Sequence, residues 1–249
     1  MSVKTVLCLG AILWVLSGIS ARLGAKEPQT HSATTPMSRE VDNWWKARHE
    51  GFNKRAVAGD VDLLFIGDSI TQGWESDGKE AWQKYYGDRK AMNIGISGDR
   101  TQHVLWRLDH GNVEGISPKL AILMIGTNNS NGKDNTAVEI ADGIKAIVAR
   151  LREKLPMTKV LILAVFPRGE KPNPQREKIA ELNHIVSQLA DDKTVFYLDI
   201  GKNFLTEDGT LAKDIMPDFL HLSPKAYDLW AKAIEPKVAE VLGDRPRVP

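Results

Sequence analysis

The sequence predicts an α/β domain with a parallel, doubly wound sheet. Five apolar runs have the length of strands, and several are continuous rather than alternating, which is typical of strands buried on both faces. Segments with apolar residues at helical spacing lie between them, and this alternation favours helices on both faces of a parallel sheet. The 249 residues, 42% of them hydrophobic, suffice for one sizeable core.

The predicted elements follow one another in regular order. The expected strands are VDLLFIG (61–67), AMNIGI (91–96), LAILMIG (120–126), KVLILAVF (159–166) and TVFYLDI (194–200). The expected helices cover 40–57, 101–109, 136–155 and 175–190, and a last helix begins at SPKAYDLW with Ser223 as its N-cap. Ligands of such sheets bind beyond the carboxyl ends of the strands, so the residues after each strand are the candidates for a site.

The N-terminus differs from the rest of the chain. Lys4 precedes an uncharged apolar run from Thr5 to Ile19 that small residues follow, a pattern typical of a secretory signal peptide over residues 1–25. The run is short for a membrane-spanning helix, so a retained membrane anchor is the less favoured alternative. We therefore expect a secreted or periplasmic protein with no stable membrane span after cleavage.

The segment 26–37, KEPQTHSATTPM, is polar and contains two prolines. Such a composition indicates a flexible linker, which would leave 38–249 as the folded domain.

Composition and motif spacing argue against several kinds of protein. The net charge is +1 and no basic run stands out, so no nucleic-acid partner is expected. The only cysteine, Cys8, falls within the predicted signal, which leaves the mature chain without a disulfide, a thiolate zinc site or a cysteine nucleophile. No H-E-x-x-H frame and no G-x-G-x-x-G stretch occurs, so neither a metal nor a dinucleotide cofactor is expected.

Polar residues and glycines follow the first two predicted strands. Ser69, in Gly67-Asp68-Ser69, could be a nucleophile or the cap of the next helix. The stretch is not a G-x-S-x-G elbow, because Thr71 occupies the last glycine position. Gly95 and Gly98 would let the backbone approach a ligand closely, or would serve only a tight turn.

Three further polar residues come later in the chain. Asn128, after the third predicted strand, could belong to a turn or donate its amide N–H to a developing oxyanion. Asp218 and His221 lie in DFLHL, with Phe219 and Leu220 as possible core anchors of the turn. A serine nucleophile needs an imidazole to take its proton, and the imidazole needs an acceptor on its other nitrogen. Taken alone, an Asp-x-x-His pair is also compatible with chance.

The remaining histidines lie in the expected linker or in helical patterns, where a surface or packed role is favoured. They are His31, His49, His103, His110 and His184. Trp44 and Trp45, beside basic residues, could form an interfacial face, but a packed N-terminal helix is favoured over it.

Four short blocks resemble those of the SGNH (GDSL-type) hydrolases, in the order of that superfamily. They are GDS, the glycine-bearing loop NIGISGD, GTNN and DFLH. The longer stretches NIGISGDRTQHVLWRL and PRGEKPNPQREK are similar to the catalytic α subunits of platelet-activating-factor acetylhydrolase type Ib, roughly over residues 60–240. The resemblance implies a three-layer, flavodoxin-like sheet of strand order 2-1-3-4-5 and a serine esterase without a cofactor.

The resemblance also implies roles for single residues. Ser69 would be the nucleophile, His221 the general base, and Asp218 the residue that orients His221. The backbone N–H groups of Ser69 and Gly98 and the side-chain amide of Asn128 would form the oxyanion hole.

The same resemblance suggests an acyl pocket. Ile70, Arg168 and Gly169 would crowd it and favour acetyl over long acyl chains.

The mammalian subunits are intracellular, whereas this chain carries an expected export signal, so their phospholipid substrate is not inherited with the fold. We expect an ester of O-acetylated carbohydrate as the substrate, with a lipid acetylhydrolase as the alternative. A non-catalytic glycan- or protein-binding module is the alternative of another class, and it would require a broken catalytic set. The subunits of that family dimerise, so a homodimer is also expected.

Overall fold

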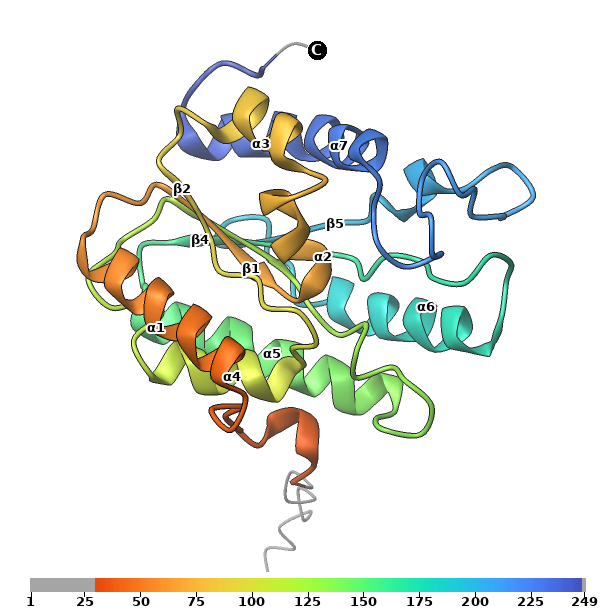
Figure 1. Ribbon diagram of the computed structural model, residues 1–249, viewed down its shortest axis with the longest axis horizontal. Coiled ribbons are helices and arrows are strands. Elements are labelled where there is room, and N and C mark those ends of the chain that lie inside the picture. The colour runs from red at the N-terminus through yellow and green to blue at the C-terminus, as the bar shows by residue number, and fades with distance from the viewer. Residues whose placement is uncertain (1–29, 248–249) are drawn as a thin grey trace, which may run out of the picture.

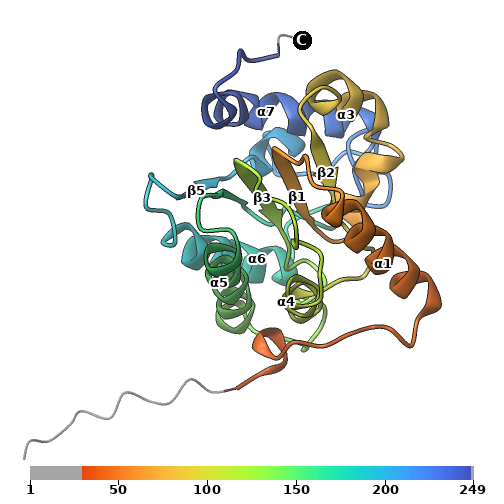
Figure 2. The same cartoon turned by 90° about the vertical axis from the view of Figure 1, so that its left-hand side faces the viewer.

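The chain folds into three layers, with a parallel sheet between two layers of helices (Figures 1 and 2). The computed structural model describes residues 30–247. The strands, in the spatial order β2-β1-β3-β4-β5, are β1 (Leu63–Gly67), β2 (Ala91–Asn93), β3 (Leu120–Met124), β4 (Lys159–Leu163) and β5 (Val195–Leu198). The predicted α/β class and the strand order 2-1-3-4-5 are confirmed.

Helices cover both faces of this sheet. One face carries α1 (Asn43–Val57), α4 (Thr101–Asp109), α5 (Ala137–Lys154) and α6 (Pro174–Ser187), and the other carries α3 (Lys79–Tyr86) and α7 (Pro224–Leu242). Short elements complete the described chain: η1 (Ser32–Thr34), α2 (Ser69–Gln72), η2 (Gly73–Glu75) and η3 (Gly201–Phe204).

Alternate residues of the central strands enter two separate apolar cores. Leu64 and Ile66 pack with α4, α5 and α6, whereas Leu63 and Phe65 pack with α3 and α7. All five residues of β1 are buried, which explains why its sequence is a continuous apolar run rather than an alternating one.

The last helix starts as its sequence predicts. Ser223 Oγ accepts the backbone N–H of Ala226 at 3.3 Å, and Pro224 occupies the first turn. Gly243, at φ 73°, ends the helix in the left-handed conformation that glycine adopts readily.

The edge strand β2 is shorter than the predicted 91–96. The chain leaves the sheet after Asn93 because Gly95 packs directly on the backbone of α2, where a Cβ would lie only 2.4 Å from the Gln72 nitrogen. The sequence interpretation also missed α3, an eight-residue helix, because Gly78 at its N-cap has no side chain that could mark the start of a helix.

The expected linker is corrected by the structure. Within its described part, η1 packs on the domain, Ala33 is fully buried and its carbonyl accepts the Thr101 hydroxyl at 2.8 Å. Gly143 makes this approach possible, since a Cβ there would lie 2.7 Å from the Ala33 oxygen. Residues 30–37 are therefore a packed segment, not a flexible linker. The predicted signal peptide lies outside the described residues.

No helix within residues 30–247 is both long enough and apolar enough to span a membrane.

Candidate active site

The predicted site residues meet at the carboxyl edge of the sheet. Ser69 opens α2 directly after β1, Gly98 lies in the turn after β2, and Asn128 follows β3. Asp218 and His221 come from the loop that leads into α7. Four segments that are distant in the sequence thus converge where parallel sheets bind their ligands.

A chain of hydrogen bonds joins the serine, the histidine and the aspartate. Ser69 Oγ lies 3.0 Å from His221 Nε2, and His221 Nδ1 lies 2.6 Å from Asp218 Oδ2. If Nδ1 carries the proton and donates it to the carboxylate, Nε2 is left to accept from the serine hydroxyl. This arrangement can deprotonate Ser69 as it attacks an ester carbonyl.

Hydrogen bonds keep Asp218 charged. Partial burial raises the pKa of its carboxyl, but the His221 side chain and the backbone N–H groups of His221 and Leu220 outweigh burial, so the net pKa of Asp218 is lowered. An ionised Asp218 stabilises the imidazolium that forms when His221 takes a proton.

The acid–base loop is held by its apolar residues and by one backbone bond. Phe219 and Leu220 are partly buried against the core between the sheet and α7, and Leu222 is buried within it. Phe219 adopts φ 60°, and its carbonyl accepts the Gly169 N–H at 2.7 Å. A bulky residue in the left-handed region is uncommon and marks a turn that the surroundings hold in place. The expected anchoring role of Phe219 and Leu220 is confirmed.

The predicted oxyanion donors are linked through Asp99. The Asn128 amide donates to the Asp99 carbonyl at 2.9 Å, which occupies one of its two hydrogens. Gly98 precedes Asp99, is exposed and adopts φ 77°. Among residues 30–247, no hydrogen bond uses the Gly98 N–H or the second Asn128 amide hydrogen. Both are available to a ligand.

A cluster around the fully buried carboxylate of Asp99 supports these donors, and the sequence interpretation missed it. The Asp99 carboxylate accepts hydrogen bonds from Arg107 Nε at 2.9 Å, Trp45 Nε1 at 2.7 Å and Arg39 Nη1 at 3.1 Å. Burial raises the pKa of Asp99, and these three donors offset only part of that rise, so the net pKa of Asp99 is raised. The charges of Asp99 and Arg107 lie in the sequence within "GDRTQHVLWR", but only the fold shows that they pair.

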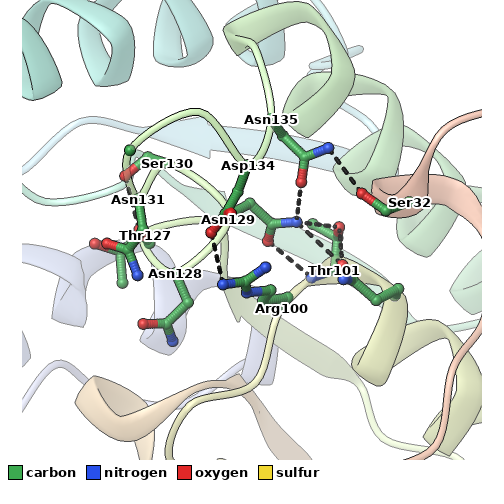
Figure 3. A network of polar contacts seen from close by, with 12 residues as sticks. Ser32, Arg100, Thr101, Thr127, Asn128, Asn129, Ser130, Asn131, Asp134 and Asn135 are labelled. Carbon is green, nitrogen blue, oxygen red and sulfur yellow. Dashed lines mark hydrogen bonds and ion pairs between the residues drawn. The ribbon is translucent and has the colours of Figure 1, made fainter.

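The second asparagine of the GTNN turn is structural. Asn129 Oδ1 accepts the Thr101 N–H at 3.0 Å, and its Nδ2 donates to Asn135 at 3.1 Å (Figure 3). The same Nδ2 donates to Gln102 Oε1 at 3.1 Å. This network fastens the turn that carries Asn128 to the start of α4.

Asp68, the residue before the predicted nucleophile, is a buried carboxyl. Its Oδ1 accepts the Ile70 N–H at 3.0 Å, and its Oδ2 has no partner among the described residues. Burial raises the pKa of Asp68 to about 7; the Ile70 bond lowers it and the nearby Asp99 raises it. Asp68, the chain neighbour of Ser69, therefore titrates near neutral pH.

The three residues expected in an acyl pocket lie in different surroundings. Ile70 is 2% exposed within the apolar core of α3 and α7, whereas Arg168 is half-buried and donates to the Thr127 carbonyl at 3.2 Å and to Asn131 at 2.9 Å. Gly169 contacts the acid–base loop through its bond to Phe219. Arg168 and Gly169 border the site, and the acyl-pocket role of all three stays a prediction.

Other histidines and tryptophans have structural surroundings. Burial lowers the pKa of His103 to about 3, and its ring accepts the Arg100 N–H at 3.0 Å. Trp45 is fully buried and Trp44 is exposed, so the N-terminal helix is packed on the domain as favoured. Within residues 30–247, no group of three or more His, Cys, Asp or Glu side chains is placed to hold a metal.

Two cavities of the described chain lie away from this site. One of about 490 Å³ lies between α6 and η3, and another of about 500 Å³ lies beside β2; neither is lined by Ser69, Asp218 or His221. The catalytic candidates sit instead at an open part of the surface.

Comparisons with known proteins agree with this geometry. Residues 65–229 match the model of the GDSL-like lipase/acylhydrolase family. The chain is 39% identical over 206 residues to the platelet-activating factor acetylhydrolase IB subunit alpha2 of Gallus gallus, which covers 82% of this chain and 88% of the relative.

Solved structures share the fold. A GDSL-like lipase from Bacteroides thetaiotaomicron superposes with a TM-score of 0.64 at 19% identity, over 78% of this chain and 98% of that one. A carbohydrate acetylesterase family member from Sinorhizobium meliloti superposes with a TM-score of 0.55 at 20% identity, over 73% and 98%.

The curated relatives correct the predicted location. They are named as subunits of platelet-activating factor acetylhydrolase IB, the family whose mammalian subunits the sequence analysis describes as intracellular, and this contradicts the expectation of a secreted or periplasmic protein. The residues of the membrane-anchored alternative lie outside those that the structure describes.

Proposed function

This chain belongs to the GDSL-like lipase/acylhydrolase family of the SGNH superfamily, and on that premise we propose that it removes acetyl groups from esters through an acyl-enzyme on Ser69. Ester hydrolysis itself follows from the family. The observation that carries the proposed mechanism is the unbroken hydrogen-bonded chain from Ser69 through His221 to Asp218.

The first half of the reaction acylates the serine. His221 Nε2 takes the hydroxyl proton while Ser69 Oγ forms a bond to the carbonyl carbon, and the carbonyl oxygen becomes an oxyanion. The backbone N–H groups of Ser69 and Gly98 and the Asn128 amide stabilise that charge. The tetrahedral intermediate then collapses, the bond to the leaving alcohol breaks, and His221 returns the proton to the alcohol oxygen.

The second half reverses these roles with water. His221 takes a proton from a water molecule, whose oxygen attacks the acetyl-serine carbonyl in the same oxyanion hole. The bond to Ser69 Oγ breaks and the serine recovers its proton from His221, which releases acetic acid.

The acceptor is a separate part of the proposal. The expected carbohydrate acceptor depended on export, which is now corrected, and the acetylesterase from Sinorhizobium meliloti is similar in fold alone. Relatives named platelet-activating factor acetylhydrolase, 36–39% identical to this chain, favour an acetylated phospholipid instead. We therefore place the lipid acetylhydrolase first and the carbohydrate esterase second. The homodimer stays a prediction that light scattering tests.

A substrate screen tests this function. We expect turnover of p-nitrophenyl acetate that declines with longer acyl chains, and release of acetate from acetylated lysophospholipid in preference to acetylated xylan. Ser69→Ala should abolish both turnover and labelling by a fluorophosphonate probe. The control is Ser76→Ala, which removes an exposed hydroxyl bonded only to the Gly73 carbonyl and should change neither. Undiminished turnover in Ser69→Ala contradicts the mechanism, and preference for xylan reverses the order of acceptors.

A further inference from the structure

An arginine from the N-terminal segment reaches the turn that carries Gly98. Arg39 Nη1 donates to the Ser97 carbonyl at 2.8 Å and to the Asp99 carboxylate at 3.1 Å. Its guanidinium also covers one side of Gly98, since a Cβ there would lie 3.2 Å from the Arg39 Nη1 nitrogen. Residue 39 lies before the segment 65–229 that matches the family model.

The bond to Ser97 bears directly on the Gly98 donor. The Ser97 carbonyl and the Gly98 N–H belong to one peptide unit, which is planar and trans, as are the other peptide bonds of the described chain. In a trans peptide the two groups point in opposite directions. An arginine that holds the Ser97 oxygen therefore directs the Gly98 N–H away from itself, and a positive charge on the carbonyl polarises the same peptide and strengthens its N–H as a donor.

The bond from Arg39 to Asp99 also affects the Asn128 amide, the second donor of the predicted oxyanion hole. The Asp99 carbonyl accepts from the Asn128 amide, so the position of Asp99 sets the orientation of that amide. Arg107 and Trp45 hold the Asp99 carboxylate from inside the protein, and Arg39 holds it from the surface, with its side chain 27% exposed.

Hydrogen bonds attach the segment that carries Arg39 to the start of α4 and to Asn135, which follows the GTNN turn. Ser32 Oγ accepts from Asn135 at 3.0 Å, the Ala33 carbonyl accepts from Thr101, and the Met37 N–H donates to the Gln102 carbonyl at 3.1 Å. Figure 3 shows Ser32 reaching the network around Asn129 and Thr101. These bonds give the Arg39 backbone a defined place from which its side chain can act.

We infer that Arg39 is a positioning residue of the oxyanion hole, which holds the Ser97–Gly98 peptide and, through Asp99, the Asn128 amide in the orientation that the tetrahedral intermediate requires. This inference rests on the proposed function, because it assumes an oxyanion at Gly98. Gly98 has a flexible backbone at positive φ, so without Arg39 its peptide is free to rotate.

The inference makes a kinetic prediction. The oxyanion exists only after the serine has attacked, so loss of Arg39 should lower kcat while KM stays within about twofold. Removal of an oxyanion donor costs about 10²–10³ in kcat. Loss of a residue that acts through the donors should cost less, about tenfold.

Three variants test it on p-nitrophenyl acetate. Arg39→Ala should show the tenfold fall in kcat, and Arg39→Lys, which keeps a cationic donor, should recover part of it. Arg55→Ala is the matched control, because Arg55 donates to the Gly59 and Asp60 carbonyls at the far end of α1 and should leave kcat unchanged. Thermal unfolding and circular dichroism establish that each variant is folded.

A second measurement does not depend on turnover. Hydrogen exchange of the peptide that contains Asp99, whose N–H donates to the Ile96 carbonyl at 3.1 Å, should accelerate in Arg39→Ala and not in Arg55→Ala. A folded Arg39→Ala protein with kcat within twofold of wild type, or with only KM raised, overturns the inference. If Arg39→Ala does not fold, the same comparison is made with Arg39→Gln. If the wild-type protein has no esterase activity, the proposed function is contradicted rather than the role of Arg39. In that case, an unchanged rate of hydrogen exchange at Asp99 in Arg39→Ala would still show that Arg39 does not hold the turn.

Discussion

The two halves of the candidate site are built in different ways. The oxyanion half depends on Asp99, a fully buried carboxylate between Arg107, Trp45 and Arg39. The acid–base half depends on Asp218 and His221, whose side chains are 55% and 46% exposed on a surface loop. The two halves therefore meet different requirements. The oxyanion donors have to be preorganised and must not move, whereas the base, His221, needs access to substrate and water.

Because the two halves differ in burial, changes in them should affect stability and activity differently. An exposed ion pair contributes little to folding, whereas loss of one partner of a buried pair leaves an uncompensated charge. We therefore expect changes in the acid–base half to cost activity alone, and changes in the oxyanion half to cost both.

The largest effect is expected in the acid–base half. His221→Ala should lower kcat/KM by about 10⁴-fold or more, because Ser69 loses its base. The free energy of unfolding should change by less than about 1 kcal/mol, since the pair with Asp218 is exposed. His184→Ala, an exposed histidine on α6, is the control for both quantities. Strong destabilisation by His221→Ala would break the proposed contrast between the halves.

A change in the buried cluster should act on stability. Asp99→Asn keeps the shape of the side chain but leaves the buried Arg107 without its counter-charge, which should lower the free energy of unfolding by about 3 kcal/mol in urea titrations and lower kcat as well. The control is Asp60→Asn, which removes an exposed pair with Lys90 and should cost less than about 1 kcal/mol. Equal costs for the two variants would show that Asp99 is not the support of the oxyanion half.

A further effect concerns pH and the buried carboxyl of Asp68, the residue before Ser69. The pKa of Asp68 is about 7 in the folded chain and 3.8 as a free group, so the folded state holds this proton more tightly and stability declines as pH rises between about 4 and about 7. Asp68→Asn removes this decline. We expect the variant to gain about 4 kcal/mol on wild type between pH 4 and pH 8, since each unit of pKa difference corresponds to about 1.4 kcal/mol. A pH-independent difference in urea titrations would contradict the assignment.

Much of the fold could be predicted because it depends on local patterns. Continuous apolar runs identified all five strands, and Ser223 and Pro224 marked the start of α7. The predicted ends were less accurate, since β2 stops where Gly95 packs on α2, a contact that no local pattern announces. The packed segment before Met37 was missed for a related reason: its polar composition hides the single buried residue, Ala33, that fits against Gly143.

The candidate site divides in the same way. The residue types and their order, Ser69, Gly98, Asn128, Asp218 and His221, were apparent from the sequence, because each follows a strand or precedes a helix with recognisable signals. Their hydrogen bonds were only expected, and the structure supplies them for the acid–base half. Asp99 escaped notice because a charged residue in a turn is ordinary unless it is known to be buried.

By itself, the sequence determined the order of strands and helices, the class of fold and the residues that carry chemistry, since these depend on patterns within a few residues. Only the tertiary structure decided which charges pair. Asp99 meets Trp45 and Arg39 across 54 and 60 residues of chain, and Ser69 meets His221 across 152. Burial and contacts at such separations arise when the sheet and its two helical layers close on one another, and no local pattern contains them.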